Sequence, residues 1–207
     1  MRPRDRDGHD GLSIDTEVSA MDRENAISVW REYNSEDSLF RHALSVEAAM
    51  RHFAQKYGED EDFWGIAGLL HDIDYQEYPT EHLGHSRAML KKAGFGEDFI
   101  HAVQSHGWGL CSDVEPSHRM EKVLYAVDEL TGFIAACAYV RPSRSVLDLE
   151  VKSVKKKWGT AAFAAGVRRD VIEKGAAMMH VPLEELISET ILALRAVAAD
   201  VGLKGSI

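Results

Sequence analysis

G-L-L-H-D-I-D-Y, residues 68–75, places a histidine and two aspartates directly after a run of apolar residues. The residues just before it, 63–70, are almost all apolar and are expected to lie in a core. An unpaired carboxylate inside a core costs several kcal/mol, so buried carboxylates usually meet a partner charge or a metal ion. What this stretch does therefore depends on which other side chains reach His71 and Asp72.

The bulk composition is that of a globular protein with an acidic balance. The chain has 207 residues, of which 45% are hydrophobic and 28% charged, and its formal net charge is -10. This balance argues against a nucleic-acid partner, because such proteins usually carry basic surfaces. Residues 141–180 differ, with nine Lys/Arg against four Asp/Glu. This basic segment is either a site for an anionic small molecule or an ordinary solvated face.

The cysteines and the apolar runs indicate the cellular compartment in which the protein is expected. Cys111 and Cys137 form no C-x-x-C pair and no disulfide framework. The N-terminus lacks the apolar core of a signal peptide, and the longest apolar run, 133–140, is too short to cross a bilayer. We expect a cytoplasmic protein that does not bind membranes, and the sequence leaves its oligomeric state open.

Helical periodicity dominates the chain from Met21 onward, and alternating strand patterns are hard to find. The sequence predicts a flexible tail at 1–20 and one compact all-α domain at 21–207. Its core is expected at about 36–135, with C-terminal helices at 146–199 packing on it. The expected helices are 22–33, 36–57, 61–72, 81–93, 97–106, 118–139, 146–158, 167–179 and 183–199.

His42 and Asp128 occupy apolar surroundings on two separate predicted helices. His42 adjoins the apolar stripe of its helix, whereas His52 lies ten residues later and is turned by about 80°. Asp128 lies in the nearly all-apolar segment K-V-L-Y-A-V-D-E-L-T-G, while its neighbour Glu129 points about 100° away, towards water. We therefore expect His42 and Asp128 to face inward.

For the remaining histidines, helix geometry only partly decides which side chains face inward. In 97–106, His106 shares a face with apolar residues, whereas His101 points to the opposite side and is expected to be solvated. The glycines of S-H-G-W-G leave His106 near an open rim. His82 and His85 share a helix face, and the sequence does not decide which of them reaches inward.

His42, the pair His71–Asp72 and the distant Asp128 together make a plausible set of metal ligands. Imidazole and carboxylate suit iron, manganese, zinc or cobalt, and the helices of a bundle can bring such ligands together in a core. Each residue alone is more often a satisfied core residue than a ligand. The combination favours a metal site, because a cation compensates the buried carboxylates.

The order H…HD…D, here His42, His71–Asp72 and Asp128, resembles the signature of the HD-domain metal-dependent phosphohydrolases. The resemblance spans roughly residues 36–135, and pieces such as S-H-G-W-G resemble a small branch of predicted hydrolases. It implies an all-helical HD-domain bundle with a metal site in its core. The site would hold one or two divalent ions, which could be Mn, Fe, Zn, Co or Mg.

The same resemblance implies how the ligands divide. Some family members hold two ions, and by that similarity Asp72 would bridge them. One ion would be held by His42, His71 and Asp128, and the other by His82 and His106, with His85 as the alternative to His82.

Two motifs of relatives are missing. Many relatives read H-D-I-G-K, whereas this chain has Tyr75 in place of the lysine, and the G-Y-P motif of cyclic-dinucleotide-cleaving relatives is absent. Phosphate would then be bound by other residues, although an ordinary surface role is the alternative for each cation. The substrate-binding candidates are Arg141, Arg144, Lys122 and Trp108, the last of which either stacks on a base or covers the site.

The implied reaction is hydrolysis of a phosphate ester of a nucleotide or another small phosphorylated metabolite by a metal-activated water. Asp72 and Asp74 are the catalytic candidates; Asp74 would transfer the leaving-group proton, and turn capping is the alternative role for it. A non-catalytic metal- or nucleotide-binding regulatory module is the alternative function. A di-iron oxygenase is a third, weaker hypothesis.

Overall fold

The computed structural model describes residues 22–207, and within this range the protein is all α-helical, as the sequence predicts. The expected tail at 1–20 lies outside the described residues. None of the helices in residues 22–207 is long and apolar enough to cross a membrane. The helices are α1 (Arg23–Tyr33), α2 (Asp37–Tyr57), α3 (Glu61–Leu70), α4 (Ser86–Lys92), α5 (Glu97–Ser105), α6 (Arg119–Tyr139), α7 (Val151–Trp158), α8 (Arg169–Met179) and α9 (Leu183–Ala196).

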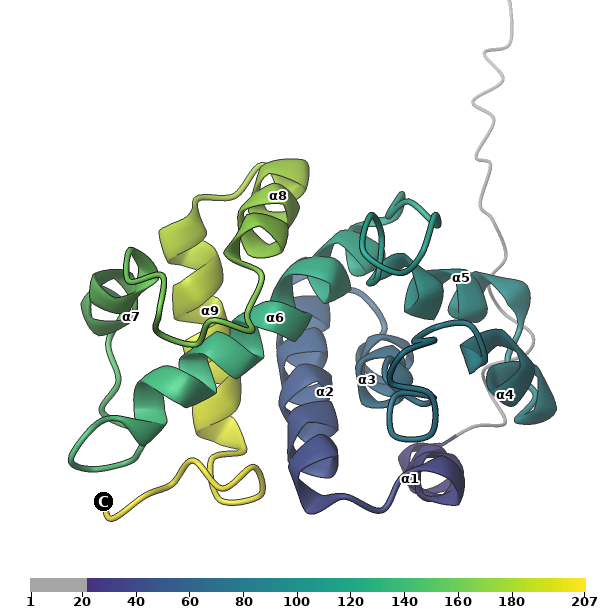
Figure 1. The fold of residues 1–207 in the computed structure, drawn as a ribbon, viewed down its shortest axis with the longest axis horizontal. Helices are drawn as coiled ribbons and strands as arrows, with labels where there is room; N and C mark the ends of the chain where they lie inside the picture. The colour runs from purple at the N-terminus through teal and green to yellow at the C-terminus, as the bar shows by residue number, and fades with distance from the viewer. Residues whose placement is uncertain (1–21) are drawn as a thin grey trace, which may run out of the picture.

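The two longest helices, α2 and α6, cross at the centre of the molecule (Figure 1). α3, α4 and α5 lie on one side of α2, and α7, α8 and α9 lie on the other. The buried stripe of α2 includes Val46, Met50 and Phe53, at the spacing expected for one helix face. α2 ends at Gly58, whose φ of 71° is the left-handed conformation that favours glycine.

α3 carries the first half of the stretch that ends in His71–Asp72. Every residue from Trp64 to Leu70 is buried, because α3 is apolar on all sides and packs closely on α2. This approach depends on Gly68, since a Cβ there would lie 3.0 Å from the backbone of Val46. α3 ends at Leu70, two residues before the expected end, so His71 and Asp72 begin the turn that follows it.

The expected helix at 81–93 begins only at Ser86. The reason is local: the side chain of Asp74 accepts hydrogen bonds from the backbone N–H groups of Leu83, His85 and Ser86. Leu83 also has a φ of 66°, which no α-helix accommodates. Residues 81–85 are therefore a turn that is organised around one buried carboxylate.

The expected helix at 146–158 also begins late, at Val151. Arg195 of α9 donates hydrogen bonds to the carbonyls of Val146 and Leu149, which holds this segment outside a helix. α8 packs on α6 at Gly175, where a Cβ would lie 2.5 Å from the Cβ of Ala126. The C-terminal helices thus pack on both α2 and α6.

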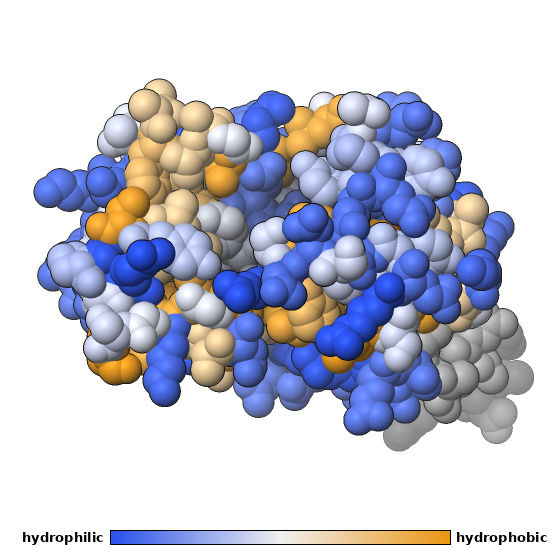
Figure 2. All heavy atoms as spheres, turned by 60° about the horizontal axis from the view of Figure 1, so that its bottom comes forward, coloured by the Kyte–Doolittle hydropathy of each residue, from blue (hydrophilic) through white to orange (hydrophobic). Residues whose placement is uncertain are grey.

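The surface is mostly hydrophilic, as expected for a chain with 28% charged residues. Figure 2 shows one face, on which hydrophilic residues predominate and the broadest hydrophobic patch lies at the upper left.

Candidate metal centre

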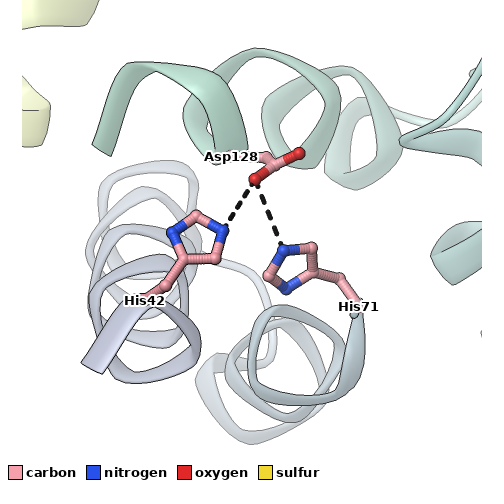
Figure 3. A group of neighbouring side chains, drawn as sticks. All are labelled: His42, His71 and Asp128. Carbon is pink, nitrogen blue, oxygen red and sulfur yellow. Dashed lines mark hydrogen bonds and ion pairs between the residues drawn. The ribbon is translucent and has the colours of Figure 1, made fainter. Parts of the chain in front are cut away.

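His42, His71 and Asp128 come from three elements and point toward one another. His42 lies on α2, His71 follows α3, and Asp128 lies in the middle of α6 (Figure 3). Asp128 Oδ1 is 2.9 Å from Nε2 of His42 and 3.4 Å from Nε2 of His71. Each of the three residues offers a ligand atom to a group whose atoms lie within 4.8 Å of one another.

Asp72 extends this cluster with its two carboxylate oxygens. Its Oδ2 is 3.4 Å from His71 Nε2 and 3.8 Å from His42 Nε2. Its Oδ1 faces a different pair of imidazoles, at 3.2 Å from His82 Nε2 and 3.4 Å from His106 Nε2. A carboxylate with one oxygen toward each of two histidine pairs has the arrangement that a ligand bridging two ions needs.

Hydrogen bonds on the far side of three rings fix their orientation. Nδ1 of His71 donates to the carbonyl of Gly68 at 2.7 Å, and Nδ1 of His106 donates to the carbonyl of Val103 at 2.6 Å. Nδ1 of His82 lies 3.1 Å from Asp74 Oδ1. Such outer partners are usual for metal-bound histidines, because they leave the Nε2 lone pair directed at the ion.

The donor set fits a cation. His71 Nε2 is buried and has no hydrogen-bond partner among the described residues, although two carboxylates face it. Nε2 of His82 and Nε2 of His106 face each other at 3.1 Å. When the rings are neutral, these lone pairs point at one another and at carboxylate oxygens, and a positive ion between them removes the repulsion.

The pKa shifts in the cluster also indicate that positive charge is favourable there. Burial raises the pKa of Asp128, but His71 and His42 outweigh it and hold that pKa well below its usual range. Burial also opposes the charged form of His82, yet the bonds and charges of Asp72 and Asp74 raise its pKa to about 9. The carboxylates are thus held ionised and attract protons or a metal ion.

The structure places His82 at this centre and His85 outside it. His85 Nε2 lies 3.2 Å from Glu81, and its ring stacks on Tyr78 with centroids 3.7 Å apart. The sequence could not separate the two, because it placed both on one helix face, whereas they lie in the turn before α4.

His52 and His101 lie apart from the centre, in agreement with the sequence prediction. His52 Nε2 pairs with Glu189 of α9 at 2.6 Å. His101 is 44% exposed and pairs with Glu121. Neither side chain lines the cavity described below.

Asp74 occupies a different place from the one its predicted catalytic role requires. Its carboxylate is fully buried and is already bonded to His82 and to the backbone of the turn at 83–86. These bonds also lower its pKa although burial opposes this, so it is a poor proton donor. Asp74 instead orients His82, which is close to the turn-capping role that was the alternative.

A cavity of about 340 Å³ opens on the histidines and aspartates. Glu129 lines it, contrary to the expectation that this side chain faces water. Its Oε2 accepts a hydrogen bond from the backbone N–H of Arg168 at 3.0 Å, and the side chain is half-buried. Burial and the neighbouring Asp128 raise the pKa of Glu129 to about 7. The cavity is lined by Leu39, His42, Asp72, Tyr75, His82, His106, Gly107, Leu110, Cys111, Asp128, Glu129, Gly132, Val167 and Val171.

The lining does not include the four residues predicted to bind substrate. Arg141 follows the end of α6, which lies eleven residues or about 16 Å along the helix from Asp128, and it pairs with Asp148 at 2.7 Å. Arg144 follows in the same loop with a φ of 50°, and Lys122 lies six residues before Asp128, about 9 Å along α6.

Trp108, the fourth of them, has a lysine over one face of its ring. Lys174 Nζ of α8 lies 3.3 Å from the centroid of its indole ring, which fits a cation–π contact. The residues that line the cavity instead, such as Leu39 and Val171, carry no sequence signal beyond that of ordinary core residues.

The comparison with known families agrees with this geometry. The profile described as "HD domain" matches residues 39–132, from the first turn of α2 to the middle of α6. These residues, a little under half of the chain, are similar to HD domains. The matched region contains the six histidines and aspartates of the cluster, and such a match is typical of metal-dependent hydrolases.

One curated relative is named "Ribonuclease Y", from Oleidesulfovibrio alaskensis (strain ATCC BAA-1058 / DSM 17464 / G20). The two sequences are 28% identical over 137 residues, which is 64% of this chain and 24% of that protein. The matched region thus covers about a quarter of the relative's length. No solved structure matches the chain.

Proposed function

We propose that this HD domain is a phosphohydrolase with a two-ion centre bridged by Asp72. The observation that carries the proposal is the division of the Asp72 carboxylate, with Oδ2 toward His42 and His71 and Oδ1 toward His82 and His106. A ligand set for one ion would not need histidines on both sides of the same carboxylate.

The proposed ligands fall into two groups, one for each ion. His42, His71 and Asp128 would hold one ion. His82 and His106 would hold the other, and Asp72 would serve both. When bound, such ions lower the pKa of water from about 15.7 towards 7 and neutralise charge on phosphoryl oxygens. Imidazole and carboxylate ligands allow manganese, iron, zinc or cobalt, and magnesium is the least suited to histidine.

The protein itself supplies rigidity and orientation. The main-chain carbonyls of Gly68 and Val103 and the carboxylate of Asp74 hold three imidazole rings with Nε2 directed inward. The cavity beside them opens to solvent and admits a small ester. We infer that the substrate is a small phosphorylated molecule.

Elemental analysis and a hydrolysis assay together test the proposal. Protein purified without chelator or an affinity metal is expected to hold two transition-metal ions per chain and to hydrolyse p-nitrophenyl phosphate when Mn²⁺ is added. Asp72→Ala should lose both ions and the activity. His82→Ala should keep about one ion, whereas the matched control His85→Ala should keep two and remain active.

Two results would contradict the proposal. Two bound ions without turnover of any phosphate ester in a broad panel would favour the regulatory-module hypothesis. Equal metal content in His82→Ala and wild-type protein would refute the assignment of the second ion.

A further inference from the structure

The walls of the cavity beside the metal ligands are largely apolar. Leu39 comes from α2, and Val167 and Val171 come from the start of the α8 region. Tyr75 and Leu110 come from the segments that follow α3 and α5. Five apolar or aromatic side chains from four parts of the chain therefore contribute to the wall of this cavity.

Two of these side chains are unusually exposed for their type. Tyr75 is 40% exposed and Leu110 is 45% exposed, although both line the cavity. The Tyr75 ring meets His82 edge to face, with centroids 5.2 Å apart, so it stands directly beside the metal ligands. An apolar or aromatic group that entered the cavity would cover both side chains and remove their apolar area from water.

Apart from the histidines, the charged side chains of the lining are acidic. Asp72, Asp128 and Glu129 all contribute to it, whereas the lining residues described by the structure include no lysine or arginine. The cations at the start of α8 and within it are engaged elsewhere. Arg168 pairs with Asp170 at 2.8 Å, Arg169 donates to the carbonyls of Thr160 and Phe163, and Lys174 lies on the ring of Trp108. A second phosphate on the substrate would therefore meet carboxylates and apolar walls.

We propose that the substrate is a phosphate monoester whose remaining part is uncharged and largely apolar or aromatic, held between Tyr75 and Leu110. This assignment rests on the proposed phosphohydrolase function. The cavity volume of about 340 Å³ is at the lower end of the range for small-molecule sites, about 300–1,000 Å³. A single small ester suits it better than a polyphosphate or a nucleic-acid strand.

A matched pair of substrates tests the charge of the leaving group. Hexyl phosphate and hexane-1,6-diol bisphosphate share the same ester and differ in the distal phosphate. The Mn²⁺-loaded protein should hydrolyse hexyl phosphate with a kcat/KM at least tenfold higher than the bisphosphate. Phenyl phosphate should exceed methyl phosphate by a similar factor, and a short RNA oligonucleotide should be the poorest substrate.

Substitutions in the cavity wall connect this preference to named residues. Leu110→Lys places a cation at the mouth and should narrow the tenfold gap between hexyl phosphate and the bisphosphate to less than threefold. Leu147→Lys is the matched control, because Leu147 is also exposed but lies in the loop after α6, outside the lining. It should leave the gap unchanged. Tyr75→Ala should reduce the preference for phenyl over methyl phosphate.

Binding provides a readout that does not depend on turnover. Titration calorimetry should show phenylphosphonate binding to the Mn²⁺-loaded protein at least fivefold more tightly than methylphosphonate, with the difference lost in Tyr75→Ala. Turnover that favours the bisphosphate or the RNA oligonucleotide would overturn the substrate class and leave the phosphohydrolase function intact. Failure to hydrolyse any phosphate ester would overturn the function, and the substrate class with it.

Discussion

Gly68→Ala should displace α3 and so change the spacing of the proposed metal ligands, although residue 68 is not itself a ligand. A Cβ at residue 68 would lie 2.9 Å from Cγ of Met50 and 3.0 Å from the backbone of Val46. The Met50 side chain can move, but the Val46 backbone belongs to the buried side of α2 and cannot. α3 must therefore shift away from α2, and it carries His71 and Asp72 away from His42.

The size of the effect follows from two opposing contributions. Overpacking of this kind costs about 1–3 kcal/mol, and replacing glycine by alanine inside a helix returns about 0.5–1 kcal/mol. The midpoints of these two ranges leave a net loss of about 1 kcal/mol in the free energy of unfolding, which lowers Tm by about 2–4 °C in a protein of this size. Mn²⁺ affinity should fall as well, because a shift of α3 changes the distance between ligands on α2 and on the turn after α3.

Thermal unfolding of the metal-free protein and calorimetric titration with Mn²⁺ measure the two effects. Gly132→Ala of α6 is the matched control, since its Cβ would meet only Val167 Cγ2 at 4.0 Å. That variant should unfold at the wild-type temperature or above it. If Gly68→Ala behaves like Gly132→Ala, the close packing of α3 on α2 is not what sets the ligand positions.

Three further predictions concern protons and buried carboxylates. Because the pKa of His82 is raised to about 9, this residue carries a proton at pH 7 that a metal ion must displace. Affinity for the second ion should therefore rise up to about tenfold per pH unit between pH 6 and 8, and a pH-independent affinity would contradict this. Asp74→Asn replaces one acceptor oxygen by a donor beside His82. The affinity for the second ion, measured by metal titration, should fall by about 10–100-fold. Glu121 at the start of α6 has a lowered pKa because the backbone N–H groups of His118 and Ser117 and the ring of His101 outweigh its burial. Its contribution to stability is present above its unfolded pKa, about 4.5, and is lost as the pH falls through the lower folded value. Glu121→Gln should flatten the dependence of urea-unfolding free energy on pH between about 3 and 5, and an unchanged slope would refute the role of this carboxylate.

The sequence was most informative where a polar residue interrupts an apolar pattern of helical period. The positions of α2 and α6 follow from apolar residues at helical spacing, and the fold class was predicted from them. His42 and Asp128 stood out because a polar group in an apolar stripe needs a partner. The stretch at 68–75 predicted a charged group in the core, and His71 is indeed fully buried.

Some residues gave no sequence signal of the place they occupy. Glu129 was expected in water because helix geometry alone turns it from Asp128, but α8 folds back and Arg168 binds it. Arg141 looked suitable for phosphate binding by its nearness in sequence, although α6 continues for eleven residues, or about 16 Å, beyond Asp128 before it ends at Tyr139. Helix period describes one element at a time, so it could not predict that the start of α8 would lie against Glu129.

The sequence alone determined that this protein is helical and that histidines and aspartates enter its core, because periodicity and the cost of burying charge are properties of short segments. Only the tertiary structure brought His82 rather than His85 to the cluster, placed Asp74 behind His82 and lined the cavity with apolar side chains. The physical reason is that a turn bound by a buried carboxylate, and a wall assembled from separate helices, depend on contacts between residues far apart in the chain.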